Sequence, residues 1–75
     1  MKSKIDQFVI NKVRELRIEK NISQADLANE LGMSVGFIGK VESLKYPSHY
    51  NLKHLNHLAK ILECSPQELL PKRPI

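Results

Sequence analysis

Apolar residues in the first part of the chain recur at the spacing of an amphipathic helix. Ile5, Val9, Val13 and Leu16 follow one another at intervals of four, four and three residues, which places them on one face of a helix. The spacing therefore predicts a helix over about residues 4–20 that buries this face. The few residues before it are expected to be loose.

A second stretch, residues 23–43, has the pattern of two short helices joined by a tight turn. Ser23 precedes an apolar stripe that ends at Leu31, and its hydroxyl can accept a hydrogen bond from the free amides of a first helical turn. Gly32 follows that stripe directly and can adopt the left-handed backbone conformation that ends a helix. Ser34 then offers the cap of a second helix.

That second helix is predicted over residues 35–43, with Ile38 and Val41 facing inward. Two helices joined by about three residues that include a glycine form a helix-turn-helix unit, whose second helix lies in the major groove of DNA. The outward side and flanks of the predicted helix carry Val35, Gly36, Phe37, Gly39, Lys40 and Ser43.

The remaining sequence predicts two more helices. Asn51 can cap a fourth helix over residues 52–63, and its inward face is expected to hold Leu52, Leu55, Leu58, Ala59 and Leu62. Ser65 and Glu68, with a proline between them, have the pattern of a capping box at the start of a short fifth helix. Cys64 is expected to pack against the core. The sequence therefore predicts an all-α, compact five-helix bundle in a single domain, residues 1–75, with an ordered core over about residues 4–70.

Composition narrows the class of protein. A chain of 75 residues with 41% hydrophobic and 27% charged residues has the balance of a soluble globular domain. The 12 lysines and arginines exceed the 8 acidic residues, and a net charge of +4 favours an acidic partner such as nucleic acid. No apolar run approaches the roughly 18 residues of a membrane span, no leader of the secretory type is present, and one cysteine excludes an internal disulfide. We therefore expect no membrane association and a cytoplasmic location.

The motifs of the central stretch together resemble the DNA-binding domain of the Cro and phage-repressor (Xre-type) helix-turn-helix family. They are Ser23-Gln24, Leu27-Ala28, Leu31-Gly32, Ser34 and the run from Ile38 to Glu42. The resemblance implies a helix-turn-helix formed by helices 2 and 3 and sequence-specific binding of double-stranded DNA by a small transcriptional regulator, a repressor. It also implies a homodimer on a two-fold related operator, with the protein on the nucleoid when bound to DNA.

The same resemblance implies roles for particular residues. Arg17 is expected to pair with Glu42, which would tie the first helix to the recognition helix. Gln24 and its neighbours are expected to hold a DNA phosphate at the start of the second helix. We take as phosphate candidates Ser23, Gln24, Gly39, Ser43, Lys45, Tyr46, His49 and Tyr50.

The base-reading side departs from the family, whose members usually place Gln, Arg, Ser or Thr there. The base-reading candidates in this chain are Ser34, Val35, Gly36, Phe37 and Lys40. Each glycine inside a helix costs about 0.5–1 kcal/mol relative to alanine, so a contact is expected to offset that loss. A bare helix surface would let Val35 and Phe37 meet thymine methyls and Lys40 reach guanine or a phosphate.

An alternative function uses the same apolar residues. Val35 and Phe37 could instead bind a protein, which would make the chain a protein-interaction or antitoxin-like module. No catalytic constellation is present, so an enzyme is not expected. His54 and His57 lie three residues apart without a third ligand, and we expect no metal site, cofactor or small-molecule ligand.

Overall fold

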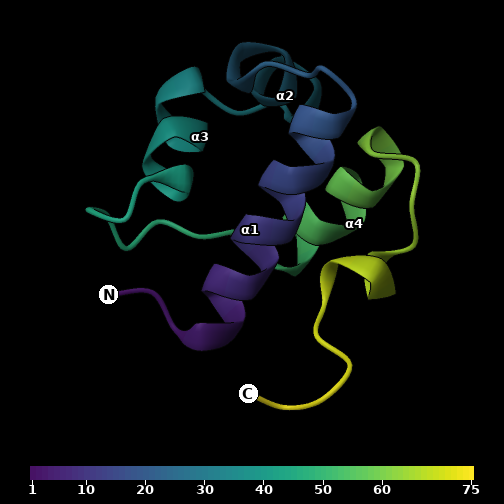
Figure 1. Ribbon diagram of the computed structural model, residues 1–75. Coiled ribbons are helices and arrows are strands. Elements are labelled where there is room, and N and C mark those ends of the chain that lie inside the picture. The colour runs from purple at the N-terminus through teal and green to yellow at the C-terminus, as the bar shows by residue number, and fades with distance from the viewer.

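The computed structural model describes all residues, 1–75, and consists of helices joined by short loops without any strand (Figure 1). Four α-helices are followed by one 3-10 helix. The elements are α1 (Lys4–Glu19), α2 (Gln24–Leu31), α3 (Val35–Glu42), α4 (Leu52–Ile61) and η1 (Pro66–Leu69).

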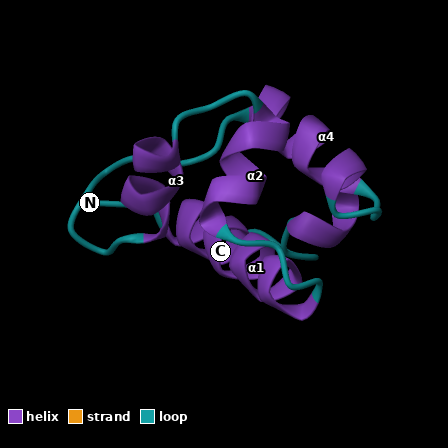
Figure 2. Ribbon diagram, turned by 90° about the horizontal axis from the view of Figure 1, so that it is seen from above, coloured by secondary structure: helices purple, strands orange, loops and turns teal.

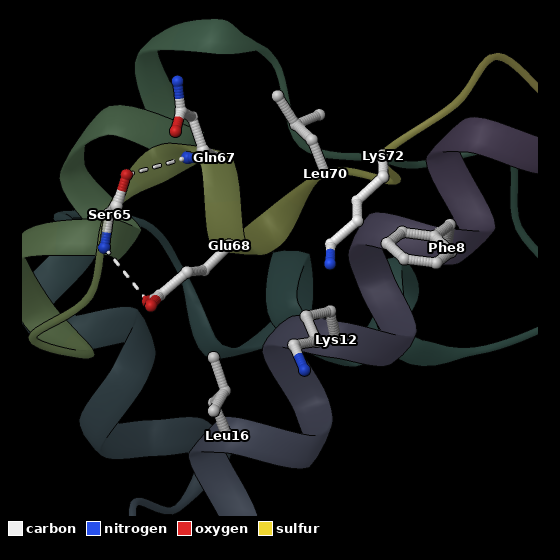
Figure 3. Close-up of a pocket in the computed structure, with 8 residues that line it drawn as sticks. All are labelled: Phe8, Lys12, Leu16, Ser65, Gln67, Glu68, Leu70 and Lys72. Carbon is white, nitrogen blue, oxygen red and sulfur yellow. Dashed lines mark hydrogen bonds between the residues drawn. The ribbon is translucent and has the colours of Figure 1, made fainter.

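The prediction of five α-helices is wrong at the last element. Residues Pro66–Leu69 form one 3-10 turn, in which Glu68 N donates to Ser65 O at 2.9 Å and Leu70 N to Gln67 O at 3.2 Å. The predicted capping box is present, because the Ser65 hydroxyl and the Glu68 carboxylate each accept a backbone hydrogen bond (Figure 3). The turn ends before the proline at position 71, which leaves too few residues to complete i to i+4 bonds.

The α-helices begin and end where their local chemistry dictates. The hydroxyls of Ser23 and Ser34 accept hydrogen bonds from the amides of Asp26 and Phe37 at 2.9 and 3.0 Å, so each satisfies an amide that has no partner within its own helix. Gly32 ends α2 with φ of 76°, in the left-handed region that favours glycine. The predicted boundaries of α2 and α3 are thus confirmed to within a residue.

The core is one cluster of 14 buried apolar residues contributed by every helix. Packing differs from the prediction at the N-terminal end of two buried stripes, because Ile5 and Leu52 are 44% and 81% exposed. Both stand in the first turn of their helices, beyond the reach of neighbouring elements. Ile10, which was not predicted, is 1% exposed. The buried face of α1 is wider than a single i, i+4 row because α1 contacts both α3 and η1, which flank it (Figures 1 and 2).

The N-terminal residues are ordered, contrary to the expectation that they are loose. The Ser3 hydroxyl accepts a hydrogen bond from Asp6 N at 3.1 Å and caps α1. Lys2 reaches from there to the end of α3, where its ammonium group donates to Val41 O at 2.6 Å. The start of the chain is therefore attached to an element about 40 residues away in sequence.

Two further predictions concern Cys64 and the absence of a membrane span. Cys64 is half-buried and packs against the core cluster, as expected, and burial raises the pKa of its thiol. None of the helices has the length and hydropathy that crossing a membrane would require.

Candidate nucleic-acid interface

Helices α2 and α3 form a helix-turn-helix whose turn is Gly32, Met33 and Ser34. Met33 N donates to Ala28 O at 2.9 Å, so the chain reverses direction directly at the end of α2. Met33 also packs against the core from its half-buried position, which fixes the turn from the inside. The turn brings α3 across the end of the domain, on the side away from η1 (Figure 1).

The inner and outer faces of α3, which we call the recognition helix, differ sharply in burial. Ile38 and Val41 are fully buried at 0% exposure. Val35, Gly36 and Lys40 on the other face are exposed, with Val35 51% exposed. Nothing in the chain itself covers these three residues, so the face is open to a macromolecular partner.

The two glycines of the recognition helix are not required by packing within the domain. A Cβ atom at Gly36 would meet only the Ser34 hydroxyl at 3.9 Å, and one at Gly39 only the Gln24 Oε1 atom at 3.8 Å. Both distances are ordinary van der Waals contacts, and neither glycine has a positive φ. Packing within the domain therefore does not account for glycine at either position.

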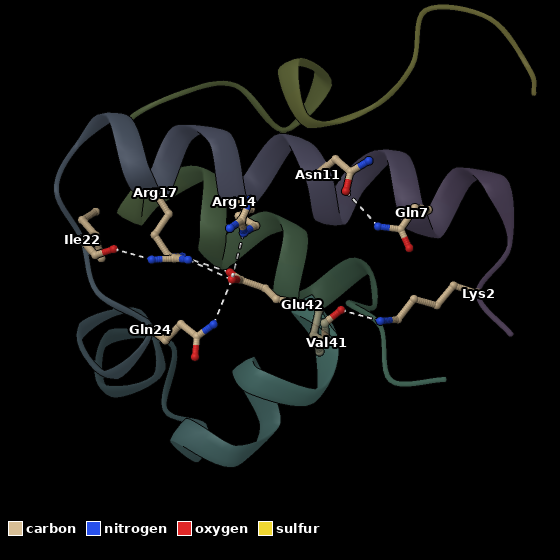
Figure 4. Close-up of polar contacts among 9 residues, drawn as sticks. All are labelled: Lys2, Gln7, Asn11, Arg14, Arg17, Ile22, Gln24, Val41 and Glu42. Atoms are coloured by element: carbon tan, nitrogen blue, oxygen red, sulfur yellow. Dashed lines mark hydrogen bonds and ion pairs between the residues drawn. The ribbon is translucent and has the colours of Figure 1, made fainter. Parts of the chain in front are cut away.

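A network of polar contacts around Glu42 sets the orientation of the recognition helix (Figure 4). Arg17 donates from Nε to Oε2 at 2.9 Å and from Nη2 to Oε1 at 2.8 Å, and its Nη1 donates to Ile22 O at 2.9 Å. Gln24 Nε2 donates to Glu42 Oε1 at 3.0 Å, and Arg14 Nε lies 3.6 Å from the same oxygen. One carboxylate, only 5% exposed, thus joins α1, α2 and α3.

The expected pair of Arg17 and Glu42 is therefore formed, and Gln24 also contacts the carboxylate. One of the two amide protons of Gln24 is used in this way, so its side chain lies against the last turn of α3 with a second proton free. Ser23 uses its hydroxyl oxygen as the cap of α2. Both residues remain candidates for a phosphate at this helix end, as a prediction.

The loop that follows α3 places cationic and polar groups beside the recognition helix. Lys45, Tyr46 and His49 are exposed, and the Lys40 ammonium lies 5.6 Å above the ring centre of Tyr46. This cation–π contact holds the lysine at the side of α3 that faces the loop. Ser43, at the junction, accepts a hydrogen bond from Lys45 N at 3.2 Å.

Tyr50 is not available to a phosphate, and its assignment as a phosphate candidate is corrected. The residue is 5% exposed and its hydroxyl is buried without a hydrogen-bond partner, and burial raises the pKa of that hydroxyl. Its ring packs against those of Phe37 of α3 and His54 of α4, with centroid distances of 6.2 and 6.1 Å. A tyrosine in a polar loop was expected at the surface, whereas here it fills the space between two helices.

The same aromatic contacts change the interpretation of Phe37 and His54. Phe37 is half-buried, with its ring 5.4 Å from that of His54, so Val35 is the more exposed apolar side chain of the recognition helix. His54, at which we expected no metal site, has a structural role: its Nδ1 atom accepts a hydrogen bond from Asn51 N at 3.0 Å and completes a capping box. Burial lowers the pKa of this imidazole.

Two contributors to the interface escaped the sequence analysis. Arg14, which lies on α1 as Arg17 does, approaches Glu42 while its side chain stays 57% exposed. Lys2 contacts the main chain at the end of α3 through Val41 and Ser43. No local pattern could have indicated either contact, because both join residues more than 25 positions apart.

A groove of about 830 Å³ lies on another side of α1, between this helix and η1 (Figure 3). Glu68 provides the one carboxylate that lines the groove, and this carboxylate accepts a hydrogen bond from Ser65 N as part of the capping box. The structure contains no cluster of three or more His, Cys, Asp or Glu side chains that could hold a metal ion. The groove is lined by Phe8, Lys12, Leu16, Ser65, Gln67, Glu68, Leu70 and Lys72.

Several solved structures have the same fold. The restriction-modification controller protein C.AhdI from Aeromonas hydrophila is 32% identical with a TM-score of 0.71, and the match covers 84% of this chain and 92% of that one. A hypothetical transcription factor, NHTF from Neisseria, is 25% identical with a TM-score of 0.73, over 91% of this chain and 75% of its own. SinR, the master regulator for biofilm formation, solved in complex with DNA, has a TM-score of 0.69 at 20% identity, covering 81% and 95%.

The family assignment comes from the sequence itself. No protein of curated function matches the chain. Residues 12–71, which include the helix-turn-helix, the Glu42 network and the loop after α3, match the family described as the Cro/C1-type HTH DNA-binding domain. The chain therefore belongs to the Cro/C1-type helix-turn-helix family of DNA-binding transcription regulators.

Proposed function

We propose that this protein regulates transcription by binding specific double-stranded DNA sequences with the recognition helix, α3, in the major groove. The observation that carries the proposal is the difference between the two faces of α3. Its inner face is fully buried while Val35, Gly36 and Lys40 are uncovered. A helix held rigidly from behind and bare in front has the geometry that groove reading requires.

The roles of the outward residues follow from the chemistry of base edges. In this function Lys40 donates to O6 and N7 of guanine, and Val35 contacts a thymine methyl. Ser34 can donate its hydroxyl proton to a base edge at the start of the helix. Gly36 allows close approach, whereas Phe37 contributes only the edge that its contact with Tyr50 leaves free.

Phosphate contacts are assigned to the groups that surround the recognition helix. Gln24 and Ser23 stand at the start of α2, where free amides and the helix dipole favour an anion. The DNA backbone is contacted from the loop after α3 by Ser43, Lys45, Tyr46 and His49. Gly39 has no side-chain donor, so its role is to allow the DNA backbone to approach α3 closely beside Gln24.

We further propose that the protein acts as a homodimeric repressor in the cytoplasm, on the nucleoid when bound. A recognition helix of 8 residues reads few base pairs, and two copies on half-sites one helical turn apart would double the sequence read. Repression would follow from occupancy of the operator.

A second candidate function, a protein-interaction module, uses the exposed Val35. It is weakened by Phe37, which packs against Tyr50 and His54 and so adds little to an apolar patch. The two functions differ in salt dependence, because contacts with phosphates release counterions and binding falls steeply with added salt.

Selection of bound sequences from a random duplex pool, followed by a salt titration of the selected site, tests the proposal. We expect a two-fold symmetric motif and a strong negative dependence of the binding constant on salt. Failure to enrich any sequence, with little association at any salt concentration, would favour the protein-interaction function.

A further inference from the structure

We propose that Lys2 is a positioning residue for DNA recognition, whose ammonium group closes the C-terminal end of the recognition helix and ties it to the start of α1. The inference rests on the proposed function of α3 and deepens it, because it assigns control of the helix direction to a residue outside the helix-turn-helix.

The recognition helix ends differently from the other α-helices. After α1, α2 and α4 the chain turns through a residue with positive φ, namely Asn21, Gly32 and Glu63. Such a residue lets following amides return to the last carbonyl groups of the helix. Ser43 at the end of α3 is extended instead, with φ of −86° and ψ of 140°, and its amide reaches only Lys40 O at 3.3 Å. The last turn of α3 therefore lacks the main-chain closure of the others.

Lys2 supplies the missing donors. Its Nζ atom donates to Val41 O at 2.6 Å and to Ser43 O, and lies 3.4 Å from Lys40 O. A lysine ammonium has three protons and no acceptor, so three carbonyl groups use its full capacity. A positive charge at the carboxyl end of a helix is also favourable to the helix dipole.

The contact joins two fixed points. Lys2 directly precedes Ser3, whose hydroxyl caps α1, so its backbone is anchored to the start of that helix. The last turn of α1 reaches the same turn of α3 through Arg17 and the Glu42 carboxylate. The last turn of the recognition helix is thus held at its main chain by Lys2 and at its side chain by Arg17 (Figure 4).

The two attachments, through Lys2 and through Arg17, together restrict the direction of the last turn of α3 more than either one alone. These attachments matter for the recognition helix because glycines at two of its 8 positions lower its intrinsic helical stability. Loss of the Lys2 contact would alter how the outward residues meet base edges. It would leave the phosphate contacts from α2 and the loop in place.

Hydrogen exchange without DNA tests the contact itself. Lys2→Met should speed exchange of the amides of residues 40–43 by about two- to fivefold, the range expected for losing a charge at a helix end. Lys4→Met is the matched control, because it removes the same charge two residues further along the chain. The side chain of Lys4 is exposed and makes no contact with α3. Unchanged exchange at residues 40–43 in Lys2→Met would overturn the proposal.

Binding to the selected site and to random duplex then tests the effect on recognition. For Lys2→Met we expect the ratio of specific to random affinity to fall by about two- to fivefold with the salt slope unchanged. Equal weakening on both DNAs, with the slope reduced by about one, would make Lys2 a phosphate contact and overturn the proposal. If the wild-type protein selects no sequence, the proposed function fails, while hydrogen exchange still decides whether Lys2 holds α3.

Discussion

Arg17 and Glu42 face each other across 25 residues of sequence and share two hydrogen bonds of 2.8 and 2.9 Å. The guanidinium of Arg17, a residue only 8% exposed, meets both carboxylate oxygens side on. Bidentate pairs of this kind combine energy with fixed geometry. Because Glu42 is the last residue of α3, the pair fixes the C-terminal end of the recognition helix against α1.

Replacing Arg17 by methionine is expected to destabilise the protein strongly. The change leaves a Glu42 carboxylate that is 5% exposed with Gln24 as its hydrogen-bond partner, and breaking one side of a buried pair costs about 3–5 kcal/mol. Urea denaturation measures the loss. The double variant Arg17→Met with Glu42→Gln should lose clearly less than the sum of the two single variants; additive losses would contradict coupling.

The two glycines of the recognition helix give a prediction in which stability and binding move in opposite directions. Gly36→Ala should stabilise the protein by about 0.5–1 kcal/mol, because alanine favours helix and its Cβ meets no obstacle. The same variant should bind its DNA site more weakly, since the added methyl group keeps α3 away from the groove floor. Thermal unfolding and a binding titration check both effects; unchanged DNA affinity would remove the case for close approach at this position.

Lys40 should discriminate between sequences. Lys40→Ala is expected to weaken binding to the selected site by about 1–3 kcal/mol, the usual value of a good base contact, and to relax preference at one position. Lys53→Ala, which removes an equal charge from an exposed position on α4, is the control. Equal losses for the two variants would show that Lys40 acts only as a charge.

The buried hydroxyl of Tyr50 should destabilise the native protein. It has no hydrogen-bond partner, and an unsatisfied buried polar group costs about 1–3 kcal/mol. Tyr50→Phe is therefore expected to raise the free energy of unfolding by about 1 kcal/mol and to leave DNA affinity unchanged. Weaker binding by this variant, with normal stability, would restore a direct role for the hydroxyl.

His54 should make stability depend on pH. Its pKa is lowered from 6.5 in the folded protein, chiefly by burial, so its contribution is present above about 6.5 and is lost as pH falls through the folded pKa. His54→Gln keeps a capping acceptor but cannot titrate, and it should lose less stability between pH 7 and pH 5 than the wild type. An equal loss of stability between pH 7 and pH 5 in the variant and the wild type would contradict this role of His54.

Features determined by neighbouring residues were accessible from the sequence. Ser23, Gly32 and Ser34 act through the backbone within a few positions of themselves, and the boundaries they predict agree with the structure. The pair of Arg17 and Glu42 followed only from the resemblance to the family. The five-helix count was wrong because the capping box at Ser65 starts a helix without fixing its length.

Features determined by contacts between distant segments were not accessible. Tyr50 lies in a loop whose composition suggests the surface, and only the meeting of α3 and α4 creates the space it fills. Leu52 fits the periodicity of a buried stripe, but no neighbouring element extends far enough to cover it. The contact of Lys2 with the end of α3 depends on the path of the whole chain.

The shared carboxylate of Glu42 also restricts how the sequence can diverge. Arg14, Arg17 and Gln24 approach the same oxygen, Oε1, from two helices, so a replacement at one of these positions changes the charge and hydrogen bonding that the others must supply. Substitutions among relatives should accordingly occur at these four sites in matched combinations. The outward residues Val35 and Gly36 of α3 make no such contact within the chain, so under the proposed function their variation would change the operator that is read.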